Sequence, residues 1–406
     1  MSLEAIVLGA GPAGSVVARR LAAAGARVAL VGSMPRPGIE GVSERSLALL
    51  AAEGIEPSAL PGPFARGGFW GARAVAGTEW LVRRDRLALA LRERAAAHGA
   101  TLLEGTAVQV SRVREEWRVA LRDGSELRAP VLIEARGRRG PEERGPRLLA
   151  LGRLYRLPRA GAGATHIEPL DFGWCWWART GAMLWLQIVG RPTQCHPREW
   201  TRAAAAQAAQ LAGLLEGASA EGPTRACAAH ARLTARPPAA GLWYAGDAAM
   251  ALDPLSGQGI HHSLSSARSV AAAILSVAGG GDPALAQRFI ALKDADDFLR
   301  SLRVAAGFYR QNAARGDFWG QTAAAYEAAY RARRPHIRGL RIERRPVLLD
   351  ERIVEREVVV CAAHPRGIWQ IAGVSVAQLI REHGESVASE RLEQAGSLRS
   401  RDTMRI

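Results

Sequence analysis

Lysine is almost absent from this 406-residue sequence, although the chain is strongly basic. Lys293 is the single lysine, so nearly all of the positive charge behind the formal net charge of +15 comes from arginine. The arginines are spread along the chain, with one denser run at residues 331–345, and no recognised nucleic-acid-binding module accompanies them. We therefore expect no nucleic-acid partner. The denser run fits a solvated face, or a site for an acidic protein partner.

Closely spaced cysteines and long apolar runs are also missing. The four cysteines have no paired spacing, which predicts reduced thiols without a disulfide framework: Cys175, Cys195, Cys227 and Cys361. The nine histidines are scattered, so no metal site is predicted. No window approaches about eighteen uninterrupted apolar residues, and the first eight residues enter a strand pattern without the basic region of a secretory signal. We expect a cytoplasmic protein that makes no membrane contact.

A glycine fingerprint follows the first predicted strand. Residues 5–8 form a short apolar run typical of a buried parallel strand, residues 15–24 have helical character, and residues 27–31 supply a second strand. In this context the spacing Gly-x-Gly-x-x-Gly predicts a dinucleotide-binding turn, in which the backbone approaches a pyrophosphate at a helix N-terminus. The predicted contact residues are Gly9, Gly11, Pro12, Ala13 and Gly14.

One expected part of this fingerprint is missing. The second strand of such folds usually ends in an acidic residue that binds the ribose hydroxyls. Here the strand ends in Gly32 and Ser33, and neither has a carboxylate. The ribose must then be held by Ser33, by a backbone group, or by Glu40 a little further along.

A second glycine-bearing motif lies about 230 residues downstream. It comprises residues 244–249, Tyr-Ala-Gly-Asp-Ala-Ala, and residues 253–260, Asp-Pro-Leu-Ser-Gly-Gln-Gly-Ile. This segment resembles the ribityl-binding motif of FAD-dependent aromatic hydroxylases, halogenases and related reductases. The resemblance implies that Asp247, after Gly246, binds the ribityl chain and that Pro254 lies beside the isoalloxazine ring. It also implies a helix N-terminus facing the pyrimidine edge, formed by Gly257, Gln258, Gly259 and Ile260, which would favour negative charge on reduced flavin.

Further segments resemble the same flavoprotein family over roughly residues 1–280. Arg45 and Arg84 match family arginines that approach the cofactor, although a surface role is as good an interpretation of either. Val108 ends the strand that touches the adenine in the family. Residues 134–139 resemble the family's Asp-Ala-Thr-Gly segment but lack its aspartate and threonine. Direct reduction by NAD(P)H is therefore in doubt, and a reductase partner is the alternative electron donor.

Two groups of side chains are candidates for the substrate side of the flavin. His261 and His262 lie next to the second motif, and one of them is a candidate proton acceptor; packing at the helix start is the alternative. Residues 173–177 are dense in tryptophan. Strand alternation places Trp174 and Trp176 on one face and Trp177 on the other. Trp174, Trp176 and Trp185 are the predicted pocket residues, and ordinary sheet core is the alternative.

Two features narrow the expected chemistry. Flavin-dependent tryptophan halogenases need a lysine in the first hundred residues and a Trp-x-Trp-x-Ile-Pro segment, and this chain departs from both patterns. Halogenation is therefore disfavoured.

The chain also resembles flavoproteins that oxygenate a peptidyl tryptophan during maturation of quinohemoprotein amine dehydrogenase. The resemblance lies in residues 39–43, in the segment after Pro335 and in the element at residues 364–367. The resemblance implies that the basic C-terminal region binds a protein partner.

These patterns predict an α/β fold: an FAD-binding, Rossmann-like three-layer domain, an interleaved β-sheet substrate domain and a small C-terminal α+β domain. The FAD-binding domain takes residues 1–150 and 225–280, with 65–80 contributing to the substrate sheet, which itself takes 151–224. A helical segment takes 281–334, the small domain 335–384, and a disordered tail 385–406.

The predicted activity is that of an FAD-dependent monooxygenase. By resemblance, FAD and O₂ would form a flavin C4a-hydroperoxide that hydroxylates an aromatic small molecule or the tryptophan of a peptide or protein, during biogenesis of a quinone cofactor. One alternative is a flavin-dependent reductase or dehydrogenase of a small unsaturated molecule. Another is a flavin-bearing assembly factor whose role is to bind a partner protein.

Overall fold

A computed structural model gives the structure, and it describes residues 2–34, 37–138, 142–193, 196–235 and 239–384. Backbone contacts divide the chain into two units. The first comprises residues 1–268 and 301–330, and the second comprises residues 269–300 and 331–406. The predicted tail at 385–406, Arg139 and Cys195 lie outside the described residues.

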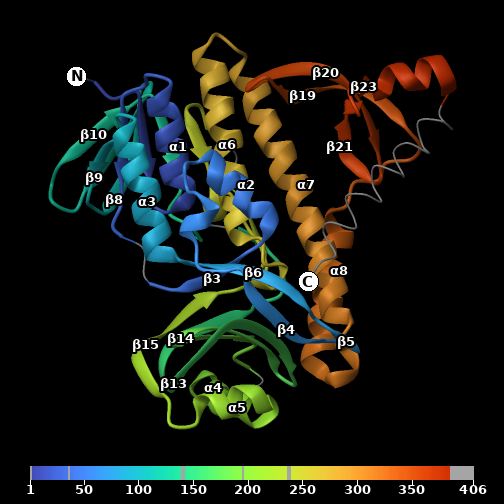
Figure 1. Ribbon diagram of the computed structural model, residues 1–406. Helices are drawn as coiled ribbons and strands as arrows, with labels where there is room; N and C mark the ends of the chain where they lie inside the picture. Colours follow the sequence, from blue (N-terminus) through green and yellow to red (C-terminus); the bar gives the residue numbers. More distant parts are fainter. Residues whose placement is uncertain (1, 35–36, 139–141, 194–195, 236–238, 385–406) are drawn as a thin grey trace. The chain divides into compact units, whose positions relative to one another are not determined.

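A parallel sheet lies at the centre of the first unit (Figure 1). Its strands are β1 (Ala5–Leu8), β2 (Val28–Val31), β7 (Thr101–Leu103), β11 (Val131–Glu134) and β17 (Leu242–Tyr244), in the order β17-β11-β1-β2-β7. All four pairings are parallel. The chain leaves β1 towards one edge first and later returns to the other side, so a topological switch point lies beside β1. The predicted Rossmann-like sheet is confirmed.

Three helices belong to this half of the unit: α1 (Pro12–Ala23), α2 (Glu44–Ala52) and α3 (Arg84–Ala97), with α1 packed against α3. Helix α3 begins directly after the strand β6 (Gly77–Arg83). Strand β7 ends at Leu103, and a separate strand begins at Ala107.

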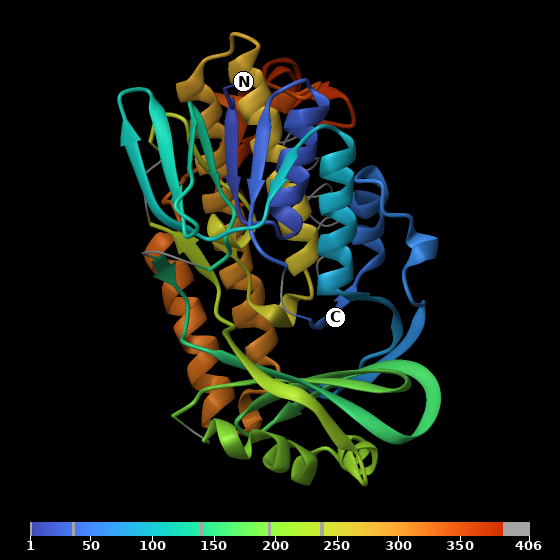
Figure 2. The same ribbon diagram turned by 90° about the vertical axis from the view of Figure 1, so that its left-hand side faces the viewer.

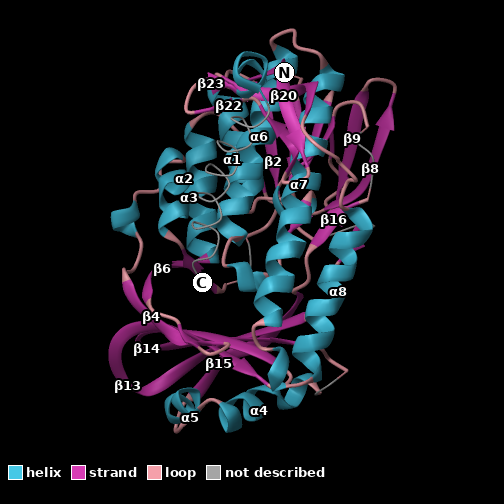
Figure 3. Cartoon of the chain, turned by 90° about the vertical axis from the view of Figure 1, so that its right-hand side faces the viewer, coloured by secondary structure: helices cyan, strands magenta, loops and turns pink. Residues whose placement is uncertain are grey.

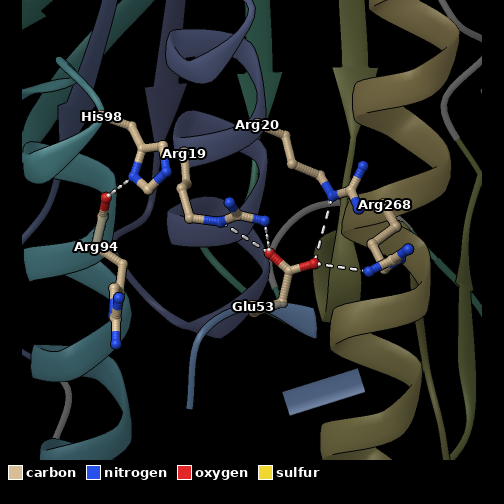
Figure 4. A network of polar contacts seen from close by, with 6 residues as sticks. All are labelled: Arg19, Arg20, Glu53, Arg94, His98 and Arg268. Atoms are coloured by element: carbon tan, nitrogen blue, oxygen red, sulfur yellow. Dashed lines mark hydrogen bonds and ion pairs between the residues drawn. The ribbon is translucent and has the colours of Figure 1, made fainter. Parts of the chain in front are cut away.

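A buried carboxylate connects the end of α2 to α1 and to Arg268 of a later helix (Figure 4). The side chain of Glu53, just after α2, is 0% exposed. It accepts hydrogen bonds from Arg19 Nε at 3.0 Å, Arg20 Nε at 3.3 Å and Arg268 Nη1 at 3.0 Å. Three guanidinium groups from two other helices therefore hold one carboxylate, which fixes α2 against them.

An antiparallel meander follows β7. Strands β8 (Ala107–Val113), β9 (Glu116–Leu121) and β10 (Glu126–Ala129) pair in sequence order. A hairpin turn at Asp123-Gly124 joins β9 to β10, with Gly124 at a φ of +89°. The apolar side chains of the meander pack with those of β1 and β11 in one core cluster. Pro130 separates β10 from β11 of the parallel sheet.

The second sheet of this unit has seven strands and lies below the parallel sheet in Figure 2. Its central path is β14-β13-β4-β6-β3, with β15 paired to β13 and β5 to β4. The strands are β3 (Ile39–Val42), β4 (Phe64–Trp70), β5 (Arg73–Ala74), β6 (Gly77–Arg83), β13 (Leu149–Leu170), β14 (Gly173–Gly190) and β15 (Ser219–Ala228). β13 and β14 form one long antiparallel pair.

Two short helices cover one face of this second sheet (Figure 3). They are α4 (Trp200–Gln207) and α5 (Ala209–Leu215), and their buried side chains share a core cluster with Leu170, Trp177 and Leu186 of the sheet. Ala208 separates the two helices, because its φ and ψ of −115° and 95° are not helical.

Three long helices follow the second motif, as predicted: α6 (Gly259–Ala278), α7 (Pro283–Arg310) and α8 (Asp317–Arg333). Within the first unit, the end of α7 and the start of α8 carry a buried aromatic cluster that includes Tyr309, Trp319 and Tyr326. A small antiparallel sheet of β12 (Glu142–Arg144), β16 (Arg232–Thr234) and β18 (Met250–Ala251) lies beside the second motif.

The second unit contains the C-terminal strands. β19 (Arg341–Leu349), β20 (Arg352–Cys361) and β21 (His364–Ile368) form an antiparallel sheet, β22 (Gln370–Ile371) pairs with β23 (Val374–Ser375), and residues 376–384 are helical. Within the same unit, the hydroxyl of Ser276 accepts a hydrogen bond from the N–H of Ile353 at 2.7 Å. Two small apolar clusters form the core of these strands and the following helix.

Candidate active site

A cavity of about 610 Å³ lies between the two sheets of the first unit. Leu8, Val31 and Ala135, at the carboxyl ends of three parallel strands, line one side of it, and Trp174 and Gln187 of the second sheet line the other. In open parallel sheets, ligands bind at the carboxyl ends of strands beside the switch point. The sheet order thus brings the two glycine motifs and the tryptophan-rich strand to one place.

The glycine fingerprint has the geometry that its sequence predicts. Gly9 has a φ of +112°, and a Cβ there would lie 2.3 Å from the carbonyl oxygen of Ala135. A Cβ on Gly14 would lie 1.9 Å from the carbonyl oxygen of Gly9, so only glycine lets α1 approach the turn. A Cβ on Gly11 would meet no protein atom within 4 Å, and Gly11 borders the cavity.

The N-terminus of α1 is suited to an anionic ligand. Its N-cap residue Gly11 has no side-chain cap, and its first turn has no acidic residue. The first-turn residues Pro12 and Ala13 line the cavity, as does Ser33 after β2. A helix N-terminus carries partial positive charge and backbone N–H groups that can bind a phosphate. These features fit the pyrophosphate of FAD.

The second motif borders the same cavity. Asp247, in a 3₁₀ turn after β17, lines it, and so do Pro254, Gly257, Gly259 and Ile260. Gly257 has a φ of +61°, which lets the chain turn directly into α6 at Gly259. The motif therefore presents a helix N-terminus to the cavity, as the resemblance implied.

Arg138 connects this motif to the end of β11, and the sequence analysis did not single it out. Its Nε lies 3.3 Å from Asp247 Oδ2, and its Nη atoms donate to the carbonyl oxygens of His230 at 2.6 Å and Leu252 at 2.9 Å. The segment thus lacks the family's aspartate and threonine but supplies a cation that orients Asp247.

Asp253 forms a buried network under the second motif. Its Oδ2 accepts hydrogen bonds from Tyr326 at 2.5 Å and Tyr309 at 3.1 Å, and its Oδ1 accepts one from the N–H of Leu255 at 2.9 Å. The Tyr309 hydroxyl in turn accepts from Trp174 Nε1 at 3.2 Å. Burial raises the pKa of Asp253 to about 6, although the hydrogen bonds lower it. The network thus connects the second motif to Trp174, which lines the other side of the cavity.

A second carboxylate, that of Glu79 on β6, belongs to the opposite wall together with Arg66 on β4 and Trp176 on β14. Burial raises the pKa of Glu79, while the charge of Arg66 and the polar groups of Thr165 and Trp176 lower it. This acidic residue was missed by the sequence analysis, because its isolated position in a short strand gives no motif.

The aromatic wall follows the predicted alternation. Trp174 and Trp176 line the cavity, whereas Trp177 stacks on His166 at 5.1 Å between ring centroids and belongs to the core cluster on the other face. Trp185 does not line the cavity. Its ring instead covers Gly152, where a Cβ would lie 2.5 Å from it.

Several other predicted residues do not line the cavity. Val108 is 59% exposed on β8, and residues 105–107 line the cavity in its place. Arg45 is exposed on α2, whereas Arg84 does line the cavity and pairs with Glu40. Gly14, Gly246 and Gln258 flank lining residues without lining the cavity themselves.

The two candidate histidines are also off the cavity. His262 is 6% exposed, and its Nε2 lies 2.7 Å from the carbonyl oxygen of Met250. This contact fits the packing interpretation of His262. His261 is partly buried on the first turn of α6 and does not reach the cavity either. The acid–base role predicted for one of these residues therefore has no support in the geometry.

Comparison with known proteins places the chain among flavoproteins. No established family profile matches the sequence, and no curated protein matches it. Among solved structures, the peptidyl tryptophan dihydroxylase QhpG, essential for tryptophylquinone cofactor biogenesis, is 32% identical with a TM-score of 0.78; the match covers 94% of this chain and 92% of QhpG. The flavin-dependent halogenase CmlS is 18% identical with a TM-score of 0.75, over 100% of this chain and 94% of its own. The myxobacterial chondrochloren halogenase CndH is 20% identical with a TM-score of 0.69, over 79% of this chain and 86% of its own. The two halogenases support the fold alone.

The two glycine motifs facing one cavity, on a fold shared with these enzymes, define an FAD-dependent oxidoreductase. The family within this class is shown by the 32% sequence identity to QhpG, which extends over 94% of this chain and 92% of QhpG. This chain belongs to the family of the peptidyl tryptophan dihydroxylase QhpG.

Two further findings bear on the wider predictions. Among the described residues, no helix has both the length and the apolar character needed to cross a bilayer. Within the same residues, the structure brings together no group of three or more histidine, cysteine or acidic side chains that could hold a metal ion.

Proposed function

We propose that this enzyme is a monooxygenase that hydroxylates the tryptophan side chain of a peptide or protein during biogenesis of a tryptophan-derived quinone cofactor. The observation that carries the proposal is the family membership, combined with a cavity whose substrate side is walled by Trp174 and Trp176. Aromatic side chains favour a flat, electron-rich ring such as indole, which stacks on them or meets them edge to face.

The chain's own residues would hold FAD in a defined orientation. Gly9, Gly11, Pro12 and Ala13 would bind the pyrophosphate, with Ser33 or Glu40 at the ribose. Asp247, oriented by Arg138, would bind the ribityl chain, and residues 257–260 would face the pyrimidine edge. Bound FAD supplies electron transfer to dioxygen and oxygen delivery. The protein aligns the aromatic ring and excludes water.

The test is mass spectrometry of indole and of a tryptophan-containing peptide after aerobic incubation with FAD-loaded enzyme and a reductant. We expect a gain of oxygen on the ring, none without dioxygen, and none with Asp247→Ala, which should also lose FAD. Rapid reduction of an unsaturated compound without oxygen gain would favour the reductase alternative. If an FAD-free variant still supported maturation of a partner protein, the assembly-factor alternative would hold.

A protein partner at the basic run is a finer part of the proposal. Within the second unit, Arg344 pairs with Glu355 at 2.8 Å, and Arg345 pairs with Glu343 at 2.8 Å and with the carbonyl oxygen of Pro365 at 2.5 Å. Arg344 and Arg345, two of the seven arginines in residues 331–345, are thus paired within the unit. A partner at this run would have to break these two ion pairs or bind beside them.

A further inference from the structure

Three buried polar atoms without partners lie together at the substrate side of the cavity. Among the described residues, Glu79 Oε2, Arg66 Nε and the hydroxyl of Thr165 have no hydrogen-bond partner of ordinary geometry. Thr165 is 1% exposed. Buried polar atoms are nearly always paired in folded proteins, so a cluster of three indicates a position where a ligand or water supplies the missing partners.

Strand register explains why these residues meet. On β4, Phe64 pairs with Glu79 of β6, and Arg66 pairs with Thr165 of β13. Residues 64 and 66 share one face of β4, so the register places Glu79, Arg66 and Thr165 on that face, within diagonal reach of one another. Both Glu79 and Arg66 line the cavity.

Glycine at position 41 makes room for the carboxylate. Gly41 lies on β3, next to β6, and a Cβ there would lie 2.1 Å from Glu79 Oε1. The groups that face Glu79 are Arg66 from β4, Thr165 from β13, Trp176 from β14 and Gly41 from β3. Arg66 is the single charged group among them. Glu79 is therefore a carboxylate held beside one cation in an aromatic wall, with one oxygen left for a ligand.

We propose that Glu79 is the catalytic base that takes the proton released by the aromatic ring, and that Arg66 is the residue that positions it. The inference rests on the proposed function, because it requires ring hydroxylation. A base in this role must be ionised before the reaction and able to carry the proton afterwards. The raised pKa of Glu79 makes its carboxylate a better proton acceptor than an ordinary glutamate.

For each oxygen inserted, a ring C–O bond forms, the O–O bond of dioxygen breaks, and the second oxygen leaves as water with two protons from the reductant or the solvent. Dioxygen is reduced by four electrons in all. Two of them would come from an external reductant through bound FAD, and two come from the ring C–H bond that is replaced. The ring C–H bond breaks last: its electron pair restores aromaticity and its proton goes to the Glu79 carboxylate, which then returns it to solvent.

The experiment compares the FAD-loaded wild type with Glu79→Gln in single-turnover hydroxylation of indole and of a tryptophan-containing peptide. We expect the hydroxylation rate to fall by about 100-fold or more, a typical loss for a general base. The wild-type rate should rise with pH through the raised pKa of Glu79, and this dependence should disappear in the variant. FAD affinity should not change.

Two further variants separate chemistry from structure. Gly41→Ala keeps the carboxylate but displaces it, and should slow the reaction without unfolding the protein. Glu221→Gln removes a carboxylate from the same sheet, where Glu221 pairs with Arg156 at 2.7 Å away from the cavity, and should have no effect. Infrared difference spectra of wild type against Glu79→Gln, recorded without substrate, report the protonation of Glu79 directly.

Three outcomes would count against the inference, and the first two distinguish its failure from that of the proposed function. If the wild type hydroxylates the ring and Glu79→Gln does so at an unchanged rate and pH dependence, Glu79 is not the base, while the proposed function stands. If the wild type adds no oxygen to either probe, the proposed function fails and takes the base role with it. An infrared signal that titrates like an ordinary glutamate would also count against the base role.

Discussion

Two buried carboxyl groups line the same cavity, and they differ in the number of hydrogen bonds that they accept. Asp253, under the flavin motif, accepts three hydrogen bonds, from Tyr309, Tyr326 and the N–H of Leu255. Glu79, on the substrate side, has one oxygen without any partner of ordinary geometry among the described residues. Burial raises the pKa of both.

The difference indicates what each group is for. A carboxyl whose oxygens are all satisfied fixes the backbone and side chains around it, and its bonds stabilise the fold. A carboxyl left unsatisfied carries its desolvation penalty without that gain, and such groups persist where function requires them. Asp253 should therefore matter for stability, and Glu79 for turnover.

Asp253→Ala should produce the largest loss of stability. At pH 4.5 the Asp253 carboxyl is protonated, so its burial carries no charge penalty and the lost hydrogen bonds count in full. Two buried tyrosine hydroxyls would be left without their acceptor. We expect the free energy of unfolding to fall by about 4 kcal/mol, measured by urea denaturation at a fixed FAD concentration. Asp123→Ala, at an exposed hairpin turn, is the control; an equal loss there would break the comparison.

Asp253 should also make the free energy of unfolding depend on pH. The folded pKa of Asp253 is raised to about 6, above the unfolded value of about 3.9. The folded protein therefore binds the extra proton between these values, and its stability falls as pH rises from 4 to 6 and then levels off. Relative to Asp253→Asn, which cannot titrate, the wild type should lose about 3 kcal/mol across this window. Parallel stability curves for the two proteins would show that Asp253 has an ordinary pKa.

Tyr326→Phe should have an intermediate effect, because it removes one of the three donors to Asp253. We expect a loss of about 1.5 kcal/mol. The pKa of Asp253 should rise further, since the Tyr326 hydrogen bond lowers it. Tyr330→Phe, one turn further along α8, is the matched control. Chemical denaturation at pH 5 and pH 7 measures both quantities, and an unchanged pH dependence would show that Tyr326 does not interact with the carboxyl.

The two carboxyl groups also differ from the rest of the site in how well the sequence predicts their surroundings. The glycine motifs and the Trp174–Trp176 face were predictable, because local turns and strand alternation depend on neighbouring residues. Tyr309 and Tyr326 follow Asp253 by 56 and 73 residues and reach it only through the packing of α7 and α8.

Glu79 was less predictable still. It meets Arg66 and Thr165 only through the register of β4, β6 and β13, which no local pattern specifies. Trp185 alternates onto the same face as Gln187, which lines the cavity, but its ring lies over Gly152 instead. The face of a strand on which a side chain lies does not by itself tell whether that side chain reaches the cavity.

The smallest expected effect on stability is that of Glu79→Gln, and it tests the comparison most sharply. Replacing an unsatisfied buried carboxylate by a neutral amide of the same shape removes a desolvation penalty and few bonds, so stability at pH 7 should change by less than about 1 kcal/mol or rise. The same substitution at Glu53, held by Arg19, Arg20 and Arg268, should lose about 3 kcal/mol. Urea denaturation of both variants and the wild type measures the two losses of stability. If Glu79→Gln lost as much as Glu53→Gln, the Glu79 carboxylate would be a structural anchor like Asp253, and its missing partners would have to come from the protein rather than from a substrate.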